Sequence, residues 1–306
     1  MMNLAVTSPE VVGIPVATLA LVVASLSLVV ALSALGWQIA KHLLDGGRVK
    51  VYLNSAVWEP ELRLLVDRSG KWNTTAGTGH IVPENIEIAQ LVVENPGRIA
   101  ITVYSPSLAI TGTKNKDYTI APRALRLKHF DADSTSSQSP IRIDPYDRVT
   151  FALDYWSIVP RLLAEAEGSH IEIRGCISRA GARKPRKSSK GLAWRIPQGA
   201  WTSREDIQKI SPYTVLWREF FKANEAISQS IEPEDATPKL ILDGILRSAM
   251  QKFDERPTSD DFLAALRESA QQYDAENVQL IMLSVTMDRI LDHYSEHLSA
   301  WPFGES

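Results

Sequence analysis

The chain has 306 residues, of which 44% are hydrophobic and 23% are charged, with a formal net charge of −3 and a single cysteine. This composition is that of an ordinary globular protein. The slightly acidic charge argues against a nucleic-acid-binding protein, and the single cysteine argues against a secreted domain with paired cysteines. The length by itself predicts about two domains.

The first feature along the chain is an uncharged, mostly apolar run over residues 11–36. A helix of roughly 20 apolar residues covers a hydrocarbon core of about 30 Å, and this run exceeds that length. Trp37 and Lys41 follow the run, where interfacial anchors belong, and a Gly-Gly pair then ends the helical pattern. The sequence therefore predicts a transmembrane helix over residues 11–45, after a short tail over residues 1–10.

The alternative for this run is a cleaved signal peptide. The segment before it carries no lysine or arginine, whereas a signal peptide begins with a basic segment. The run is also longer than the apolar core of a typical signal peptide. The small residues of the segment ALSALG offer a weak cleavage site, so the alternative stays open.

The charges that flank the run predict its orientation. Lys41, Arg48 and Lys50 follow it, while Glu10 is the only charged side chain before it. The positive-inside rule then places the N-terminus outside and the remaining domains in the cytoplasm, on an inner or plasma membrane. The single Cys176 agrees with a cytoplasmic location. An exported protein that faces the cell exterior is the remaining alternative.

A stripe of small residues repeats along the predicted span with alternating spacings of four and three. Such a stripe lets two helix backbones approach closely in lipid, and its period of 3.5 residues favours a left-handed crossing. It predicts self-association or pairing with another membrane protein. The alternative is that alanine and serine are simply common in spans. The stripe consists of Gly13, Ala17, Ala20, Ala24, Ser27, Ala31 and Ala34.

Residues 48–198 have the pattern of short strands separated by Pro, Gly and Asn turns, which predicts an antiparallel β-sandwich. The segment NPGR at residues 95–98 predicts a hairpin turn between two of these strands. A short helical insertion or a crossing between the strands is expected over residues 157–168. The predicted strands cover residues 48–53, 61–66, 86–95, 99–111, 141–143, 149–155, 170–174 and 192–197.

Two segments of this region, LVVENPGRIAITVYSPSLAI and PIRIDPYDRVTFALDY, follow a single N-terminal span and a glycine-rich join. Over about residues 10–198 the chain resembles a loose group of uncharacterised bacterial single-pass membrane proteins. The resemblance implies an immunoglobulin-like β-sandwich on one span, and it implies no activity. The matching positions are Asn95, Gly97, Arg98, Val103, Ile143, Pro145 and Asp147.

The last third of the chain changes to a helical period. Apolar residues recur at helical spacing over residues 213–227, 242–253, 262–273 and 280–298, with Thr258 or Ser259 as the N-cap of the third segment. Proline punctuates the gaps between these segments. The pattern predicts a small α-helical bundle over residues 203–300.

Charge is distributed unevenly along the chain. Residues 1–202 carry 23 basic and 17 acidic side chains, and residues 203–306 carry 10 and 19. The basic part includes a loop without acids at residues 178–191, which suits contact with anionic lipid headgroups. The alternatives are a solvated loop and a nucleic-acid site, and the slightly acidic chain argues against the latter. The basic residues are Arg179, Arg183, Lys184, Arg186, Lys187 and Lys190.

One motif could carry chemistry. His293 and His297 form an H-x-x-E-H pattern, in which two histidines on one helix face could hold zinc together with a third, acidic ligand. Glu305 is the only acid after the motif, and Glu296 belongs to an acidic face typical of solvent exposure. The chain contains no G-x-S-x-G, Walker A or G-x-G-x-x-G segment.

These patterns predict a membrane-anchored binding or adaptor protein without catalytic activity and without a cofactor. The β-sandwich would lie against the cytoplasmic leaflet, and the acidic helical bundle would bind a cytosolic protein. The alternative from a different class is a membrane-tethered enzyme or effector with a metal site at His293 and His297.

Overall fold

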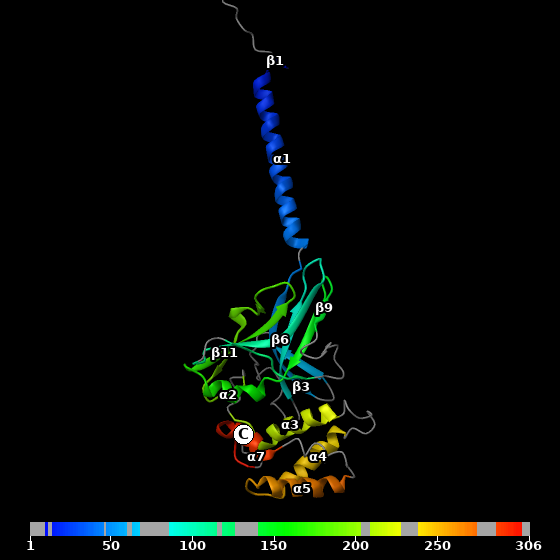
Figure 1. Cartoon of the computed structure of the whole chain (residues 1–306), viewed down its shortest axis with the longest axis vertical. Helices are drawn as coiled ribbons and strands as arrows, with labels where there is room; N and C mark the ends of the chain where they lie inside the picture. Colours follow the sequence, from blue (N-terminus) through cyan, green and yellow to red (C-terminus); the bar gives the residue numbers. More distant parts are fainter. Residues whose placement is uncertain are drawn as a thin grey trace, which may run out of the picture.

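A long N-terminal helix leads into two β-sheets, and a group of helices follows at the opposite end (Figure 1). Gly13 of the small-residue stripe and the first part of the predicted fourth helix, residues 280–285, lie outside the described residues. The computed structural model describes residues 10–11, 14–45, 47–59, 63–67, 86–114, 118–125, 140–202, 209–227, 238–273 and 286–301.

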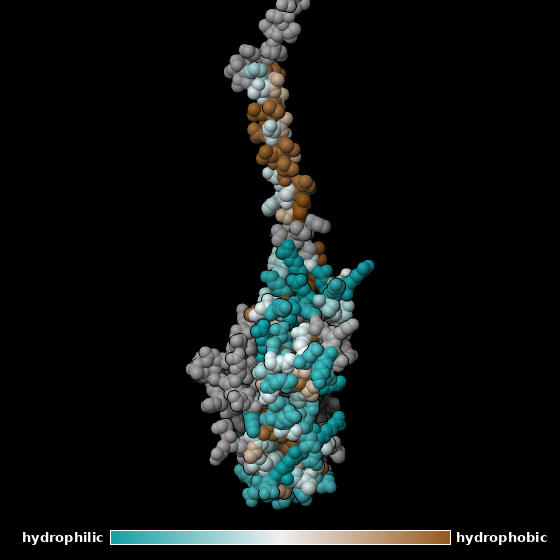
Figure 2. All heavy atoms as spheres, turned by 90° about the vertical axis from the view of Figure 1, so that its left-hand side faces the viewer, coloured by the Kyte–Doolittle hydropathy of each residue, from teal (hydrophilic) through white to brown (hydrophobic). Residues whose placement is uncertain are grey.

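The N-terminal helix is α1 (Val16–Asp45), which follows a two-residue ladder between β1 (Glu10–Val11) and β2 (Ile14–Pro15). Its segment Val16–Lys41 is long and apolar enough to cross a membrane, and its apolar window is not buried in the protein. Figure 2 shows this segment as a brown column above the mostly teal folded part. By length, composition and position, α1 suits a single membrane span and also a signal sequence.

The strands form two sheets in which all pairs of strands are antiparallel, as predicted. The first sheet has the order β4 (Arg63–Asp67), β3 (Lys50–Glu59), β5 (Ile86–Glu94), β10 (Arg148–Leu153), β8 (Ala124–Leu125). In the second sheet β11 (His170–Arg179) and β6 (Ile101–Thr111) are central, and their other partners are β12 (Arg186–Lys187), β13 (Trp194–Pro197), β7 (Tyr118–Ile120) and β9 (Ile141–Ile143).

The two sheets approach each other closely at Gly175 of β11. A Cβ atom at this position would overlap Leu91 Cδ1 and lie 3.2 Å from Leu53 Cβ. Leu53 and Leu91 belong to the first sheet and are buried. A side chain at this position would have to displace Leu91 and would crowd Leu53.

Replacing Gly175 with valine is therefore expected to destabilise the fold by about 1–3 kcal/mol, because extra atoms enter a filled interior. Chemical denaturation of the full chain measures the change. Gly168, which has no atom within 4 Å of a built Cβ, is the matched control, and its replacement is expected to have little effect. Equal stability losses for the two variants would show that the sheets do not pack this closely.

The predicted hairpin at residues 95–98 is wrong. β5 pairs with β3 and β10, whereas β6 pairs with β11, β7 and β9, so the segment is an arch that crosses between the sheets. The Asn95 amide explains the difference, because it donates to the Ile99 carbonyl at 2.9 Å and to the Ile143 carbonyl at 3.2 Å. The second bond ties the arch to the end of β9, whereas the turn of a hairpin would be closed by bonds between its own two strands.

Three helices lie where helical periods predict them: α3 (Pro212–Ile227), α4 (Lys239–Met250) and α5 (Ser259–Gln272). The short helix α2 (Val159–Ala164) lies within the helical insertion expected over residues 157–168. Thr258 is the N-cap of α5, and its side chain accepts from Asp261 N. The fourth helix of the predicted bundle is shorter than expected, because α7 (Met287–His293) ends at His293 and does not continue to Leu298. Single 3-10 turns are η2 (Trp156–Ile158), η3 (Lys190–Leu192) and η5 (Ser295–His297).

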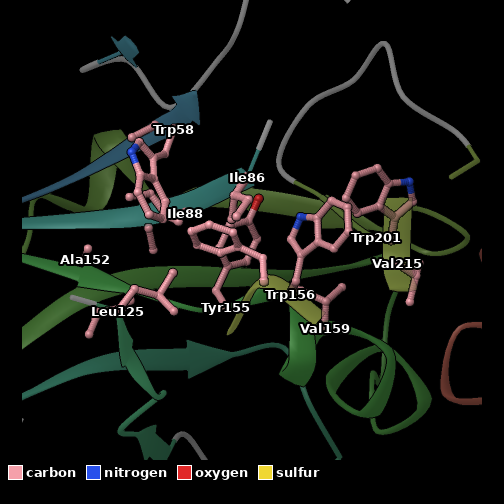
Figure 3. Packing of buried hydrophobic residues seen from close by; sticks show 14 of the residues in the cluster. Trp58, Ile86, Ile88, Leu125, Ala152, Tyr155, Trp156, Val159, Trp201 and Val215 are labelled. Carbon is pink, nitrogen blue, oxygen red and sulfur yellow. The ribbon is translucent and has the colours of Figure 1, made fainter. Parts of the chain in front are cut away.

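One hydrophobic core runs from the sheets into the helices. At the junction, Trp156 packs edge-on against Trp201, with ring centroids 4.0 Å apart (Figure 3). Trp58 of β3 packs against Phe221 of α3 at 4.9 Å. The sheets and the helices therefore form one packed body, within which the predicted boundary between residues 198 and 203 stays a prediction.

Candidate functional site

The end of the β-sheets that adjoins α1 brings four separate segments together, one of which contains Gly47. A Cβ atom on Gly47 would lie 2.6 Å from Ile101 Cγ2 and 3.6 Å from the Ile99 carbonyl oxygen. Arg179 donates to the Gly47 carbonyl at 2.7 Å, and Arg48 N lies 3.4 Å from Asn95 Oδ1. We call this end the rim, defined as residues 47–48, 95–100, 142–148 and 179–186.

Asn95 makes hydrogen bonds to several segments of the rim. Its side chain is buried, and besides Ile99 and Ile143 it reaches the Asp144 carbonyl at 3.1 Å and accepts from Gly97 N at 3.1 Å. Its backbone N donates to the Asp147 carbonyl at 2.9 Å. The arch after β5 and the turn before β10 therefore hold each other through one residue.

The rim is rich in cations. It contains eight basic and two acidic side chains. Asp144 Oδ1 is 3.2 Å from Arg142 Nε, and Asp147 Oδ1 accepts from Arg148 N at 2.8 Å, so both carboxylates are already engaged. The rim is thus strongly positive next to the end of the apolar helix. Its exposed cations include Arg48, Arg98, Arg148, Arg183, Lys184 and Arg186.

The basic loop predicted at residues 178–191 begins as a hairpin, with β12 paired to β11 at Cys176 and Ile177. Four of its six predicted lipid-contacting residues are exposed, whereas Arg179 and Lys187 are half-buried. Arg179 donates a hydrogen bond to the Gly47 carbonyl and therefore links the hairpin to the end of α1. The exposed members are Arg183, Lys184, Arg186 and Lys190.

The described members of the small-residue stripe are all exposed on α1, in a structure that holds one copy of the chain. At 100° per residue they occupy one side of the helix. The Ser27 hydroxyl donates to the Val23 carbonyl at 2.8 Å, so it is satisfied within its own helix, as a serine in lipid must be. Pairing through this stripe stays a prediction for Ala17, Ala20, Ala24, Ser27, Ala31 and Ala34.

The structure separates the two histidines of the H-x-x-E-H motif. His293 is the last residue of α7, and its Nε2 lies 2.9 Å from the Ser157 carbonyl oxygen. His297 lies in η5 and is buried, so the two rings do not share a helix face. Glu296 is exposed. Among the described residues, no group of three or more His, Cys, Asp or Glu side chains could hold a metal ion.

Burial lowers the pKa of His297 and outweighs the opposing effect of Glu296. A histidine with a lowered pKa contributes stability above its unfolded value of about 6.5, and that stability is lost as the pH falls below it. Replacing His297 with glutamine is therefore expected to flatten the loss of stability between about pH 7 and pH 5, as measured by urea denaturation. An unaltered slope in the His297 variant would contradict this role for its burial.

A buried charge cluster joins the helices to the sheets. Asp154, just after β10, lies 2.6 Å from Lys222 Nζ and 3.5 Å from Arg218 Nη2. Burial tends to raise the pKa of Asp154, but the two cations of α3 outweigh it and hold the pKa below its usual range. Lys222 also contacts Glu219. Because Asp154, Arg218 and Lys222 are all buried, the cluster fixes α3 on the first sheet and offers no chemistry to a ligand in solvent.

Glu87 extends the buried cluster into the first sheet. Its carboxylate accepts from Tyr155 and Thr202, and Trp156 Nε1 lies 3.4 Å away. The Arg218 guanidinium stacks 3.5 Å above the Trp156 ring and donates to the Glu87 carbonyl at 2.7 Å. Sequence patterns missed this set, because buried charged residues look like solvated ones until the packing is known.

The outer face of the first sheet carries a groove of about 460 Å³. Asn54 and Gln90 in its wall are hydrogen-bonded at 2.9 Å, and Glu94 lies opposite Arg148 on the neighbouring strand. Its amide, hydroxyl and charged groups could hydrogen-bond a polar ligand. The wall includes Tyr52, Asn54, Val66, Gln90, Val92, Glu94, Arg148 and Thr150.

No protein-family model matches the chain, and no curated protein matches it in sequence. The structure agrees with the resembled group at a coarse level, an apolar N-terminal helix followed by two antiparallel sheets, and no family is identified.

Proposed function

We propose that the protein is a membrane-anchored binding protein that holds its folded part against an anionic leaflet. In this proposal α1 crosses the bilayer with its N-terminus outside, and residues 47–301 lie on the cytoplasmic side. The observation that carries the proposal is the position of the rim, whose cations adjoin the end of an apolar helix long enough to span. Cations near an anionic leaflet contribute roughly 1 kcal/mol each.

The opposite end of the protein carries the proposed adaptor role. The helices α4 and α5 lie farthest from α1 (Figure 1), in the part of the chain with 10 basic and 19 acidic side chains. We propose that this end binds a cytosolic protein, and that the two sheets are an immunoglobulin-like spacer between lipid and partner. Cross-linking of the full chain in native membranes tests this part, and recovery of the chain without a cross-linked protein would contradict it.

Amine footprinting tests the lipid contact. The full chain is placed in nanodiscs of anionic or of zwitterionic lipid, and the modification of Lys184 by an amine-reactive reagent is followed by mass spectrometry. Lys184 is expected to be protected in anionic nanodiscs, and salt is expected to remove the protection because exposed charges are screened. Lys209, exposed in the helical part, is the matched control. Equal modification of Lys184 in both lipids would contradict the proposal.

No second function is proposed. His293 contacts a backbone carbonyl and His297 is buried, so the geometry of the described residues favours neither as a ligand for a metal.

A further inference from the structure

Two large apolar side chains are exposed on the rim, where cations otherwise prevail. Ile99, in the arch after β5, is 56% exposed, and Tyr146, in the turn before β10, is 70% exposed. Arg98 Nε lies 3.3 Å from Tyr146 Oη, and Tyr146 N donates to the Asn95 carbonyl at 2.8 Å, so the two loops form one tip. We call these three residues, Arg98, Ile99 and Tyr146, the rim tip.

The rim tip is located next to the end of α1 by direct contacts. The Ile99 carbonyl oxygen lies 3.6 Å from the Cβ position of Gly47, two residues after the last residue of α1. Among the described residues after α1, the one further large apolar side chain that is more than half exposed is Leu240, at 75%, and it belongs to α4 at the far end of the molecule (Figure 1). The rim tip therefore lies beside the end of α1 and is exposed to the same environment.

The backbone of Tyr146 adopts a conformation that is strained for a residue with a side chain. Tyr146 has φ +62° and is the third residue of a turn closed by Asp147 N and the Asp144 carbonyl at 3.2 Å. A positive φ at this position favours glycine, because a side chain is strained there. The ring is 70% exposed, and its hydroxyl accepts from the likewise exposed Arg98 side chain at 3.3 Å, so the turn gains little from a tyrosine at this strained position.

We propose that the rim tip enters the headgroup layer of the bilayer that α1 crosses. The three side chains match the chemistry of that layer. Tyrosine prefers the membrane interface because its ring is apolar and its hydroxyl is polar, and isoleucine extends toward the acyl chains. Arginine binds phosphate groups through its planar donors. The acids nearest the tip are already engaged, Asp144 by Arg142 and Asp147 by Arg148 N.

This inference rests on the proposed function and makes it more specific. The basic hairpin alone would hold the folded part to the leaflet by charge. A second, partly apolar contact beside the end of α1 would restrict the rotation of the folded part about the span. The acidic helical end would then point away from the membrane in a defined direction.

Depth measurements with nitroxide spin labels on the full chain in nanodiscs test the inference. Cys176 is the only cysteine and is buried, so a Cys176→Ala background allows single labels at Ile99→Cys and Tyr146→Cys. Leu28→Cys reports on the middle of α1, and Ala264→Cys on the exposed face of α5. Collision with oxygen marks hydrocarbon, and collision with a water-soluble nickel chelate marks solvent.

We expect the label at Leu28 to lie in hydrocarbon and the label at Ala264 to lie in water. We expect both rim-tip labels to lie at the interface. If Leu28 lies in hydrocarbon while both rim-tip labels are as accessible to nickel as Ala264, the inference is wrong and the proposed function survives. If Leu28 itself lies in water, the proposed function fails and the inference fails with it.

A substitution that keeps the fold gives the second test. Tyr146→Gly suits the positive φ, so the melting temperature in detergent should be unchanged or raised. In nanodiscs the same change should move the Ile99 label from the interface toward water. An unaltered depth at Ile99 would show that the ring does not contribute to membrane contact.

Discussion

Replacing Asp154 with alanine is expected to lower the free energy of unfolding by about 3–5 kcal/mol, the largest single effect we expect in this protein. The carboxylate is buried against Lys222 and Arg218. Without it, Lys222 keeps its contact with Glu219, but Arg218 loses its only ion-pair partner within the described part of the chain. A buried cation without a counter-charge is costly, because it has lost its hydration. Chemical denaturation of the full chain, followed by tryptophan fluorescence, measures the effect.

Asp292 offers a matched control, since it forms an exposed pair with Arg256 at 2.8 Å and its side chain is 66% exposed. Its replacement by alanine should change stability by less than about 1 kcal/mol. The lowered pKa of Asp154 adds a pH dependence. The stability from the ionised carboxylate is present above its unfolded pKa of about 3.9 and is lost as the pH falls toward the folded pKa. Similar losses for both variants would contradict the assignment of Asp154 as the buried anchor of α3.

Replacing Asn95 with alanine is expected to cost about 2–4 kcal/mol, because several buried backbone groups lose their partner at once. The side-chain NH2 group of Asn95 donates to the carbonyls of Ile99, Ile143 and Asp144, and its side-chain oxygen accepts from Gly97 N. The arch and the turn should then separate. Hydrogen exchange of the full chain should show faster exchange at residues 95–100 and 144–147 than in the parent protein.

Asn54 is the control for this substitution. It is also a buried asparagine, but within the described part of the chain its side chain makes a single hydrogen bond, to Gln90 at 2.9 Å. Its replacement by alanine should cost about 1 kcal/mol and leave exchange in the rim unaltered. If Asn95→Ala costs no more than Asn54→Ala, the rim is not held by Asn95.

The strand positions could be read from the sequence because alternation reports which residues face the interior. β5 and β6 fall where the pattern places them, and so does the helix before β11. The partner of each strand could not be read, because turn residues report only local backbone geometry. The NPGR segment is compatible with a hairpin and with an arch, and the Asn95 bonds to Ile143 and Asp144 decide between them.

The candidate site was predicted only in part. A run of basic residues can be recognised in a sequence without a structure, so the basic segment that contains residues 179–186 was predicted. The buried pairs of Asp154 with Arg218 and Lys222 were not, since 64 and 68 residues separate the partners. The end of α7 was placed too late because Tyr294 leaves the helix and packs near Trp156, 6.3 Å between ring centroids, which the apolar period of the sequence does not indicate. An immunoglobulin-like connection of the strands stays a prediction.

The central claim is that α1 remains in the membrane and places the rim on the cytoplasmic side. It is tested most directly by labelling single cysteines, introduced at Ser8 and at Ala264 in the Cys176→Ala background, with a membrane-impermeant maleimide. We expect the cysteine at position 8 to be labelled in intact cells and that at position 264 only after permeabilisation, both in a membrane-bound chain of full mass. Labelling at position 264 in intact cells, or a soluble chain that has lost α1, would contradict the account.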